Sequence, residues 1–276
     1  MPLISVYMPT YNRLQLLKRS LESVLNQTFK DFEIVIVDDG STDGSREFLE
    51  DISRAMPNIV FIRNDSEKHG ACRCRNIAIS HAQGRYVTGL DDDDYFHPNR
   101  LETLLRSYDP RNAAVASNYF VVDKTSVRRN SYFSRHISSS VLFTRNAVGN
   151  QILTERKRVI DVGGYDENLR ASQDLDLWIR LVDKYGPIRR ISIPLYSMDV
   201  SHDLARITTQ SSSRELGTEQ FIKKYDSRMS ASQKKFRRNF FSTSRTTGSL
   251  YWLYQLSTSY DFSLSFEVIR SKLKIG

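Results

Sequence analysis

Short apolar runs alternate with segments of helical periodicity along the first part of the chain. The apolar runs are typical of buried strands and cover residues 3–8, 32–37, 58–63 and 85–90. Between them, apolar residues recur at helical spacing after Asn12, which is placed to cap the first helix. Further helices are predicted over residues 42–52 and 70–82 and after Pro98. This alternation predicts βαβ units, an α/β fold and a mostly parallel sheet flanked by helices.

The pattern changes after residue 113. Residues 113–122 and 139–144 are strand-like, and a final strand is predicted over residues 188–200. A segment that begins at Gly163 turns through glycines and then enters a helix. The apolar face predicted for this helix consists of Leu175, Trp178, Ile179 and Val182. From residue 214 onward the chain is expected to be helical.

Polar residues follow three of the four predicted strands of the first half. These clusters are Thr10-Tyr11-Asn12, Asp38-Asp39 and Asp91–Asp94. In parallel α/β sheets, ligands bind beyond the carboxyl ends of the strands, so the three clusters are expected to face one crevice. The chain lacks both glycine-rich phosphate loops, G-x-x-x-x-G-K-[ST] and G-x-G-x-x-G. Carboxylates that hold Mg²⁺ or Mn²⁺ are the other way to neutralise a bound diphosphate.

Composition sets the class of protein. A chain of 276 residues allows one large domain or two modest ones. No apolar run is long enough for a spanning helix, and the N-terminus resembles no signal peptide. The only cysteines, Cys72 and Cys74, suit neither a disulfide framework nor a four-ligand zinc site and are expected to be small buried residues. We therefore expect a cytoplasmic protein.

Four segments in order resemble the family 2 glycosyltransferases with the GT-A fold. They are SVYMPTYNR, FEIVIVDDGSTDGS, RNIAISHAQGRYVTGLDDDD and GGYDENLRASQDLDLWIRL. The resemblance covers roughly residues 3–210 and implies a catalytic domain over residues 1–213. Residues 1–112 would form its nucleotide-sugar-binding half and residues 113–213 its acceptor-binding half, with a helical extension over residues 214–276.

The resemblance also implies donor-binding residues. Those expected at the nucleotide are Pro9, Thr10, Tyr11, Asp39, Arg75, Asp91 and Asp92. Asp39 would face an N–H of the base, and Asp92 would reach the ribose. Alternatively, Asp38 and Asp39 form a turn that caps the next helix, and Arg75 lies on a solvated helix face. The family's D-x-D pattern matches Asp91 and Asp93, with Asp93 as the leading ligand for Mn²⁺ or Mg²⁺ and Asp94 as a structural residue.

Catalysis in this family requires a base on the acceptor side. Asp174 matches the catalytic carboxylate of an E-D pair, although this chain has Gln173 where the glutamate is usual. Asp176 is the second candidate base and is expected instead to brace the helix. One base without a nearby carboxylate nucleophile favours single displacement with inversion. His202 matches loosely a histidine of relatives that could touch the metal or the diphosphate.

The last part of the chain carries the net charge of +8, since residues 221–276 contain 11 basic and 3 acidic residues. Basic and aromatic residues interleave over residues 221–245, which is typical of a helix on an anionic membrane surface. Many relatives act on lipid-linked glycans at the inner membrane face, so a peripheral location there is expected. The alternatives are a helical extension that packs its aromatic residues on the body and, less favoured, nucleic-acid binding.

Taken together, the motifs predict transfer from a UDP-sugar to a glycan or lipid-linked glycan of a surface polysaccharide. An aspartate facing a base N–H suits uracil, and dTDP-sugars remain open because thymine presents the same edge. Two alternatives are a sugar nucleotidyltransferase and a non-catalytic binding protein. The first usually has a glycine-rich, Lys/Arg-bearing signature where this chain has PTYNR, and the second does not need Asp93 and Asp174.

Overall fold

Strands from both halves of the chain join one sheet in the computed structural model, which describes residues 1–130, 135–149, 151–202, 204 and 211–242. The strands are β1 (Ile4–Thr10), β2 (Phe32–Asp38), β3 (Ile59–Arg63), β4 (Tyr86–Gly89), β5 (Tyr95–Phe96), β6 (Ala114–Val122), β7 (Val127–Arg129), β8 (His136–Ile137), β9 (Leu153–Glu155) and β10 (Ile188–Asp199). The helices are α1 (Leu14–Leu25), α2 (Ser45–Ala55), α3 (Ala71–His81), α4 (Arg100–Ser107), α5 (Ser139–Leu142), α6 (Arg156–Asp161), α7 (Gln173–Tyr185), α8 (Ser211–Lys224) and α9 (Ala231–Ser242), with a 3₁₀ turn, η2, at Asp226–Arg228.

The sheet has the order β3-β2-β1-β4-β9-β6-β10-β5, with β7 beside β6 and β8 beside β10. The first four strands are parallel, as predicted. The second half is mixed, because β9 runs antiparallel to both β4 and β6 whereas β6 and β10 are parallel. The α/β fold is therefore confirmed, and the carboxyl ends of β1, β2 and β4 lie side by side at one edge.

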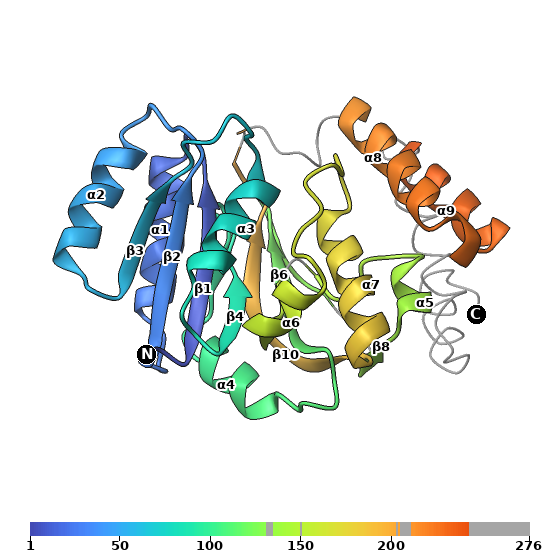
Figure 1. Cartoon of the computed structure of the whole chain (residues 1–276), viewed down its shortest axis with the longest axis horizontal. Helices are drawn as coiled ribbons and strands as arrows, with labels where there is room; N and C mark the ends of the chain where they lie inside the picture. The colour runs from blue at the N-terminus through green and yellow to red at the C-terminus, as the bar shows by residue number, and fades with distance from the viewer. Residues whose placement is uncertain (131–134, 150, 203, 205–210, 243–276) are drawn as a thin grey trace, which may run out of the picture.

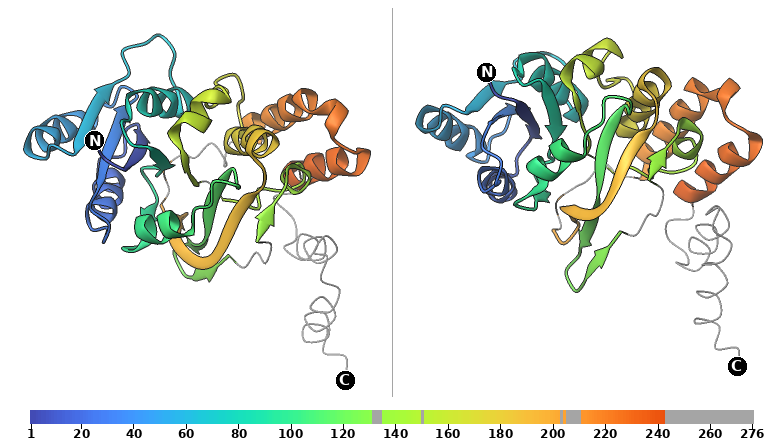
Figure 2. Two further views of the ribbon diagram at one scale, coloured as in Figure 1. Left: turned by 60° about the horizontal axis from the view of Figure 1, so that its bottom comes forward. Right: turned by 90° about the horizontal axis from the view of Figure 1, so that it is seen from below.

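Helices cover both faces of the sheet (Figures 1 and 2). Alternate residues of β1 point to opposite faces, so Val6 packs in the cluster with α1, α2 and α4 and Tyr7 in the cluster with α3, α6 and α7. The predicted apolar face of α7 is buried, and Trp178 is completely inaccessible. Cys72 and Cys74 are free and buried, as expected.

Two local predictions are wrong. Asn12 does not cap α1, because its backbone is left-handed (φ 50°) and its side-chain oxygen accepts the N–H of Thr42 instead. The carboxylate of Asp43 instead accepts the N–H of Leu14, the first residue of α1, at 2.8 Å. Residues 139–144 do not form a strand, because Ser139–Leu142 form one helical turn. An apolar run this short has no period that distinguishes a strand from a helix.

Helices α8 and α9 pack beside α7 and α5 (Figures 1 and 2). Helix α8 and the segment that joins it to α9 contribute buried residues to the same hydrophobic cluster as α7, namely Phe221, Ile222, Tyr225 and Met229. Phe221 and Tyr225 therefore pack on the body, as one alternative predicted. Residues 243–276, which complete the predicted extension, lie outside the described residues.

Candidate active site

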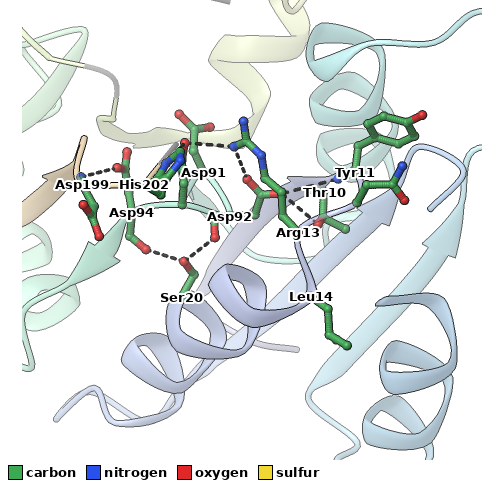
Figure 3. Close-up of polar contacts among 12 residues, drawn as sticks. Thr10, Tyr11, Arg13, Leu14, Ser20, Asp91, Asp92, Asp94, Asp199 and His202 are labelled. Carbon is green, nitrogen blue, oxygen red and sulfur yellow. Dashed lines mark hydrogen bonds and ion pairs between the residues drawn. The ribbon is translucent and has the colours of Figure 1, made fainter. Parts of the chain in front are cut away.

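The ends of β1, β2 and β4 meet through direct hydrogen bonds. The hydroxyl of Thr10 donates to the carboxylate of Asp92 at 2.9 Å, and the backbone N–H of Asp39 donates to the carbonyl of Thr10 at 2.9 Å. Arg13, at the start of α1, donates through Nη1 to Asp92 and to Asp93, both at 2.9 Å (Figure 3). The predicted convergence of the three strand ends is thus confirmed.

The four aspartates form a turn that the neighbouring elements hold in place. Ser20 of α1 donates its hydroxyl to the backbone carbonyls of Asp92, at 2.9 Å, and Asp94 (Figure 3). The Asp94 side chain is 1% exposed and accepts the hydroxyl of Tyr196 and, at 2.8 Å, the N–H of Asp199. Burial and the charge of Asp93 hold the pKa of Asp94 well above its ordinary value. These contacts connect the turn to β10 and agree with the structural role expected for Asp94.

Arg13 gives the other three aspartates an asymmetric environment. Burial raises the pKa of Asp92 to about 6, although the Arg13 guanidinium acts in the opposite direction. Asp91 accepts a hydrogen bond from Nη2 of a different arginine, Arg75, at 2.7 Å. Arg13 is the functional candidate that the sequence pattern did not reveal, and its place directly after the Tyr11-Asn12 strand end is the only signal for it.

Arg75 is buried, so the alternative of a solvated helix face is wrong. Its guanidinium lies 5.3 Å from the centre of the Tyr165 ring, and the hydroxyls of Tyr165 and Tyr7 are 2.9 Å apart. Burial alone would lower the pKa of Arg75, but the carboxylates of Asp91 and Asp174 outweigh it and hold that pKa well above its ordinary value. Arg75 therefore remains a cation beside both carboxylates.

Asp174 lies in the first turn of α7 and is half-buried. Within the described residues its carboxylate makes no hydrogen bond or ion pair. Burial raises the pKa of Asp174 to about 6; Arg75 lowers it and Asp91 raises it. A carboxylate that is accessible, unpaired and ionised near neutral pH has the properties required of a general base.

Asp176, two residues further on, is completely buried and fully engaged. Its carboxylate accepts hydrogen bonds from Arg180, at 2.6 Å, and Tyr225, at 2.8 Å, and Lys224 lies 2.7 Å from it. These contacts fit the expectation that Asp176 braces the helix. They leave it no access to an acceptor.

The residues expected to contact the nucleotide base differ in their exposure and in their hydrogen bonds. The ring of Tyr11 is 56% exposed at the end of β1, whereas Pro9 is buried within that strand. Asp39 accepts hydrogen bonds from Asn64 at 2.6 Å, His69 at 3.1 Å and the N–H of Gly70 at 2.7 Å. Asp38 is buried and accepts the N–H of Ser41 at 3.1 Å. Asp38 thus has the turn-forming role that one interpretation gave it, but neither aspartate caps α2, whose N-cap is Gly44. Asp39 instead holds the loop before α3.

Asp93 and His202 form the candidate metal pair. Nε2 of His202 lies 3.2 Å from Oδ2 of Asp93, and Nδ1 of His202 is buried without a hydrogen-bond partner in the described part of the chain. A carboxylate and an imidazole suit Mn²⁺, and a diphosphate and water would have to complete the coordination. Among the described residues, no group of three or more His, Cys, Asp or Glu side chains is placed to hold a metal ion. The pair therefore fits a metal that binds together with its nucleotide.

Comparison with known proteins assigns the chain to a family. The model of glycosyl transferase family 2 matches residues 5–163. The chain belongs to glycosyl transferase family 2. The putative colanic acid biosynthesis glycosyl transferase of Escherichia coli (strain K12) is 35% identical over 248 residues, which cover 86% of each chain. Membership of family 2 makes the chain a glycosyltransferase rather than a nucleotidyltransferase or a non-catalytic binding protein.

Solved glycosyltransferase structures share the fold of this family 2 chain. S. aureus TarS 1–349 in complex with UDP-GlcNAc has a TM-score of 0.65 at 19% identity, covering 89% of this chain and 74% of that one. The mannosyltransferase PcManGT from Pyrobaculum calidifontis, in complex with GDP-Man and Mn²⁺, has a TM-score of 0.62 at 19% identity, covering 88% and 70%. The chain spans only 44% of the longer TarS chain. These likenesses support the GT-A architecture and carry no residue roles.

Proposed function

We propose that the protein is an inverting glycosyltransferase of surface polysaccharide biosynthesis. It transfers a sugar from a UDP-sugar, or a dTDP-sugar, to a hydroxyl of a glycan or lipid-linked glycan. The observation that carries this proposal is the carboxylate of Asp174, which is unpaired within the described residues and electrostatically coupled to Arg75 and Asp91. A base placed near the cation of the donor site has the arrangement that direct displacement requires.

The nucleotide is proposed to lie across the ends of β1 and β2. The exposed Tyr11 ring can stack on the base, beside Pro9 and Thr10, and Asp39 retains acceptor capacity for a base N–H after its three hydrogen bonds. Asp92 is proposed to reach the ribose. Uracil and thymine present the N–H that such a carboxylate accepts. Of the solved structures with this fold, TarS is in complex with UDP-GlcNAc and PcManGT is in complex with GDP-Man.

The diphosphate is proposed to lie in front of the aspartate turn. Asp93 and His202 are the residues that would hold Mn²⁺ or Mg²⁺, and Asp91 contributes indirectly because it is paired with Arg75. A divalent ion bound there supplies positive charge that stabilises the departing diphosphate. Arg13 and Arg75 add fixed positive charge on either side of the turn.

Asp174 is proposed to accept the proton of the acceptor hydroxyl. The hydroxyl oxygen then forms a bond to the anomeric carbon while the bond from that carbon to the diphosphate oxygen breaks. The electron pair of the broken bond leaves with the nucleoside diphosphate. Because attack and departure occur on opposite faces of the sugar, the anomeric configuration is inverted.

The proposed setting is the cytoplasmic face of a membrane. The E. coli relative is named for colanic acid biosynthesis, which supports a polysaccharide product for this chain. No helix among the described residues is both long and apolar enough to cross a membrane. Attachment through residues 221–245 would be peripheral, and Phe221 and Tyr225 are not available for it because they are buried.

Two measurements test the proposal. Thermal-shift titrations with UDP-GlcNAc, dTDP-glucose and GDP-mannose, with and without Mn²⁺, should show the largest stabilisation for a UDP- or dTDP-sugar in the presence of metal. A response to GDP-mannose alone would reject the donor assignment. Asp174→Asn should keep UDP and Mn²⁺ affinity and lose about 100-fold to 10,000-fold in sugar transfer. Glu22→Gln, which changes an exposed carboxylate on α1, is the control.

A further inference from the structure

The segment that leads into Asp174 is held by the C-terminal helices. Gln220 of α8 accepts the backbone N–H of Arg170 at 3.0 Å and donates to the backbone carbonyl of Asn168 at 3.1 Å. Lys224, one helical turn further on, lies 2.6 Å from the carboxylate of Asp166. Three positions of residues 166–170 are therefore bonded to one helix from outside the predicted catalytic domain.

Helix α8 also approaches the next residue of this segment without an intervening side chain. A Cβ atom at Gly217 would lie 2.5 Å from the backbone nitrogen of Ala171, so only glycine permits the observed packing. This close contact sets the distance between the segment and α8. Gly217 and Gln220 lie almost one helical turn apart and present one surface to residues 168–171.

Helix α9 completes the contact at Ser172, the residue before α7. Ser172 has a left-handed backbone (φ 62°), which a residue with a side chain adopts only where its surroundings enforce it. Nη2 of Arg237 donates to the Ser172 hydroxyl at 2.8 Å. The Arg237 guanidinium is 3% exposed and stacks on Phe221 of α8 at 3.9 Å from the ring centre. The cation that reaches Ser172 is thus itself fixed by the packing of α9 on α8.

Asp174 depends on this segment for its position. Its carboxylate makes no hydrogen bond or ion pair within the described residues, so no polar contact of its own holds it in place. Its backbone lies two residues after Ser172 and continues into α7, where Lys224 and Tyr225 also bind Asp176. We propose that α8 and α9 are a positioning element for the general base, with Gln220 and Arg237 as its principal positioning residues. This inference rests on the proposed role of Asp174.

The test compares two adjacent arginines of α9. Arg237→Gln removes the contact with Ser172, and Arg238→Gln makes the same change at an exposed residue that pairs with Glu219 at 2.7 Å. Hydrogen exchange of residues 166–174 is measured in the full chain without ligand. We expect faster exchange in Arg237→Gln, wild-type exchange in Arg238→Gln and partial rescue in Arg237→Lys. Gln220→Ala, at an exposed side chain, should also accelerate exchange and serves if Arg237→Gln fails to fold.

Release of UDP from UDP-GlcNAc with Mn²⁺ connects the positioning to catalysis. Arg237→Gln and Gln220→Ala should lower kcat about 10-fold to 100-fold, because a small misplacement of a reacting group has effects of this size. UDP affinity should stay within about 2-fold of wild type, since the nucleotide contacts are unchanged. A general loss of stability would not separate kcat from nucleotide binding in this way.

Three results would overturn the inference. They are unchanged exchange in both variants, an equal effect of Arg238→Gln, and faster exchange with wild-type UDP release. An active Asp174→Asn enzyme would instead refute the proposed function, and the exchange data would still decide whether the helices hold the segment.

Discussion

Nη2 of Arg75 lies 2.7 Å from Oδ1 of Asp91, and this pair connects the donor side of the crevice to the candidate base. Arg75 is buried beneath the turn, and its charge acts on Asp174 as well as on Asp91. A single cation thus compensates two carboxylates with different proposed tasks. One carboxylate completes the D-x-D pattern, and the other removes the acceptor proton.

Replacing Arg75 should affect both carboxylates. Arg75→Gln removes the positive charge that lowers the pKa of Asp174, so the acidic limb of the kcat profile should move to higher pH. Loss of one partner of a buried ion pair should also destabilise the protein by on the order of 3 kcal/mol. Urea unfolding and a pH series of UDP release measure the two effects. Arg73→Gln, on the same helix but more exposed, should change neither, and an unmoved acidic limb in Arg75→Gln would argue against the coupling.

The wild-type pH profile follows from the environment of Asp174. Its pKa is raised to about 6, and a base acts only when it is deprotonated. We therefore expect kcat to rise about 10-fold per pH unit below that pKa and to level off above it. Asp92, whose pKa is also about 6, lies on the donor side and should appear in nucleotide affinity instead. Measuring UDP affinity over the same pH range separates the titration of Asp92 from that of Asp174. A kcat that stays constant from about pH 5 to about pH 8 would contradict the assignment of Asp174 as the general base.

Arg13 is expected to compete with the metal ion. It shares its Nη1 between Asp92 and Asp93, so it neutralises the carboxylates while no divalent cation is bound. Arg13→Gln should lower the melting temperature by several degrees, given roughly 2–4 °C per kcal/mol for a chain of this size. In the presence of UDP, Mn²⁺ should then raise the melting temperature more in the variant than in the wild type, because the ion replaces the lost charge. Lys18→Gln, at an exposed residue of α1, is the control, and equal Mn²⁺ shifts in all three proteins would exclude competition.

The sequence predicted those parts of the site that local patterns encode. Apolar runs followed by acidic clusters located the ends of β1, β2 and β4, and the helical apolar face of α7 placed Asp174 in its first turn. The burial of Arg75 was not predicted, because the apolar residues of α3 are spread around the helix and do not indicate which side faces the core. Its burial depends on Asp91 and Tyr165, which lie 16 and 90 positions further along the chain.

Long-range contacts also explain the other errors. Asn12 is a good helix cap by type, but the loop from Ser41 to Asp43 binds its backbone and supplies the cap instead. The docking of α8 and α9 on residues 166–172 depends on a close approach at Gly217 and on a buried arginine. Basic and aromatic composition alone left membrane contact and packing on the body as alternatives for this region. Part of the region is continuous with the core.

Membrane attachment remains a prediction for the outward side of this extension. Phe221 and Tyr225 face the core, so binding must depend on exposed cations such as Lys235 and on residues 243–276. The full chain should bind vesicles of phosphatidylglycerol and phosphatidylcholine, and rising salt should weaken binding. Lys235→Gln should reduce affinity about 5-fold, as expected for roughly 1 kcal/mol per basic residue. Lys30→Gln, at an exposed residue distant in sequence from α9, should have no effect. If the full chain does not sediment with anionic vesicles at low salt, the extension serves the enzyme only through its packing on the body.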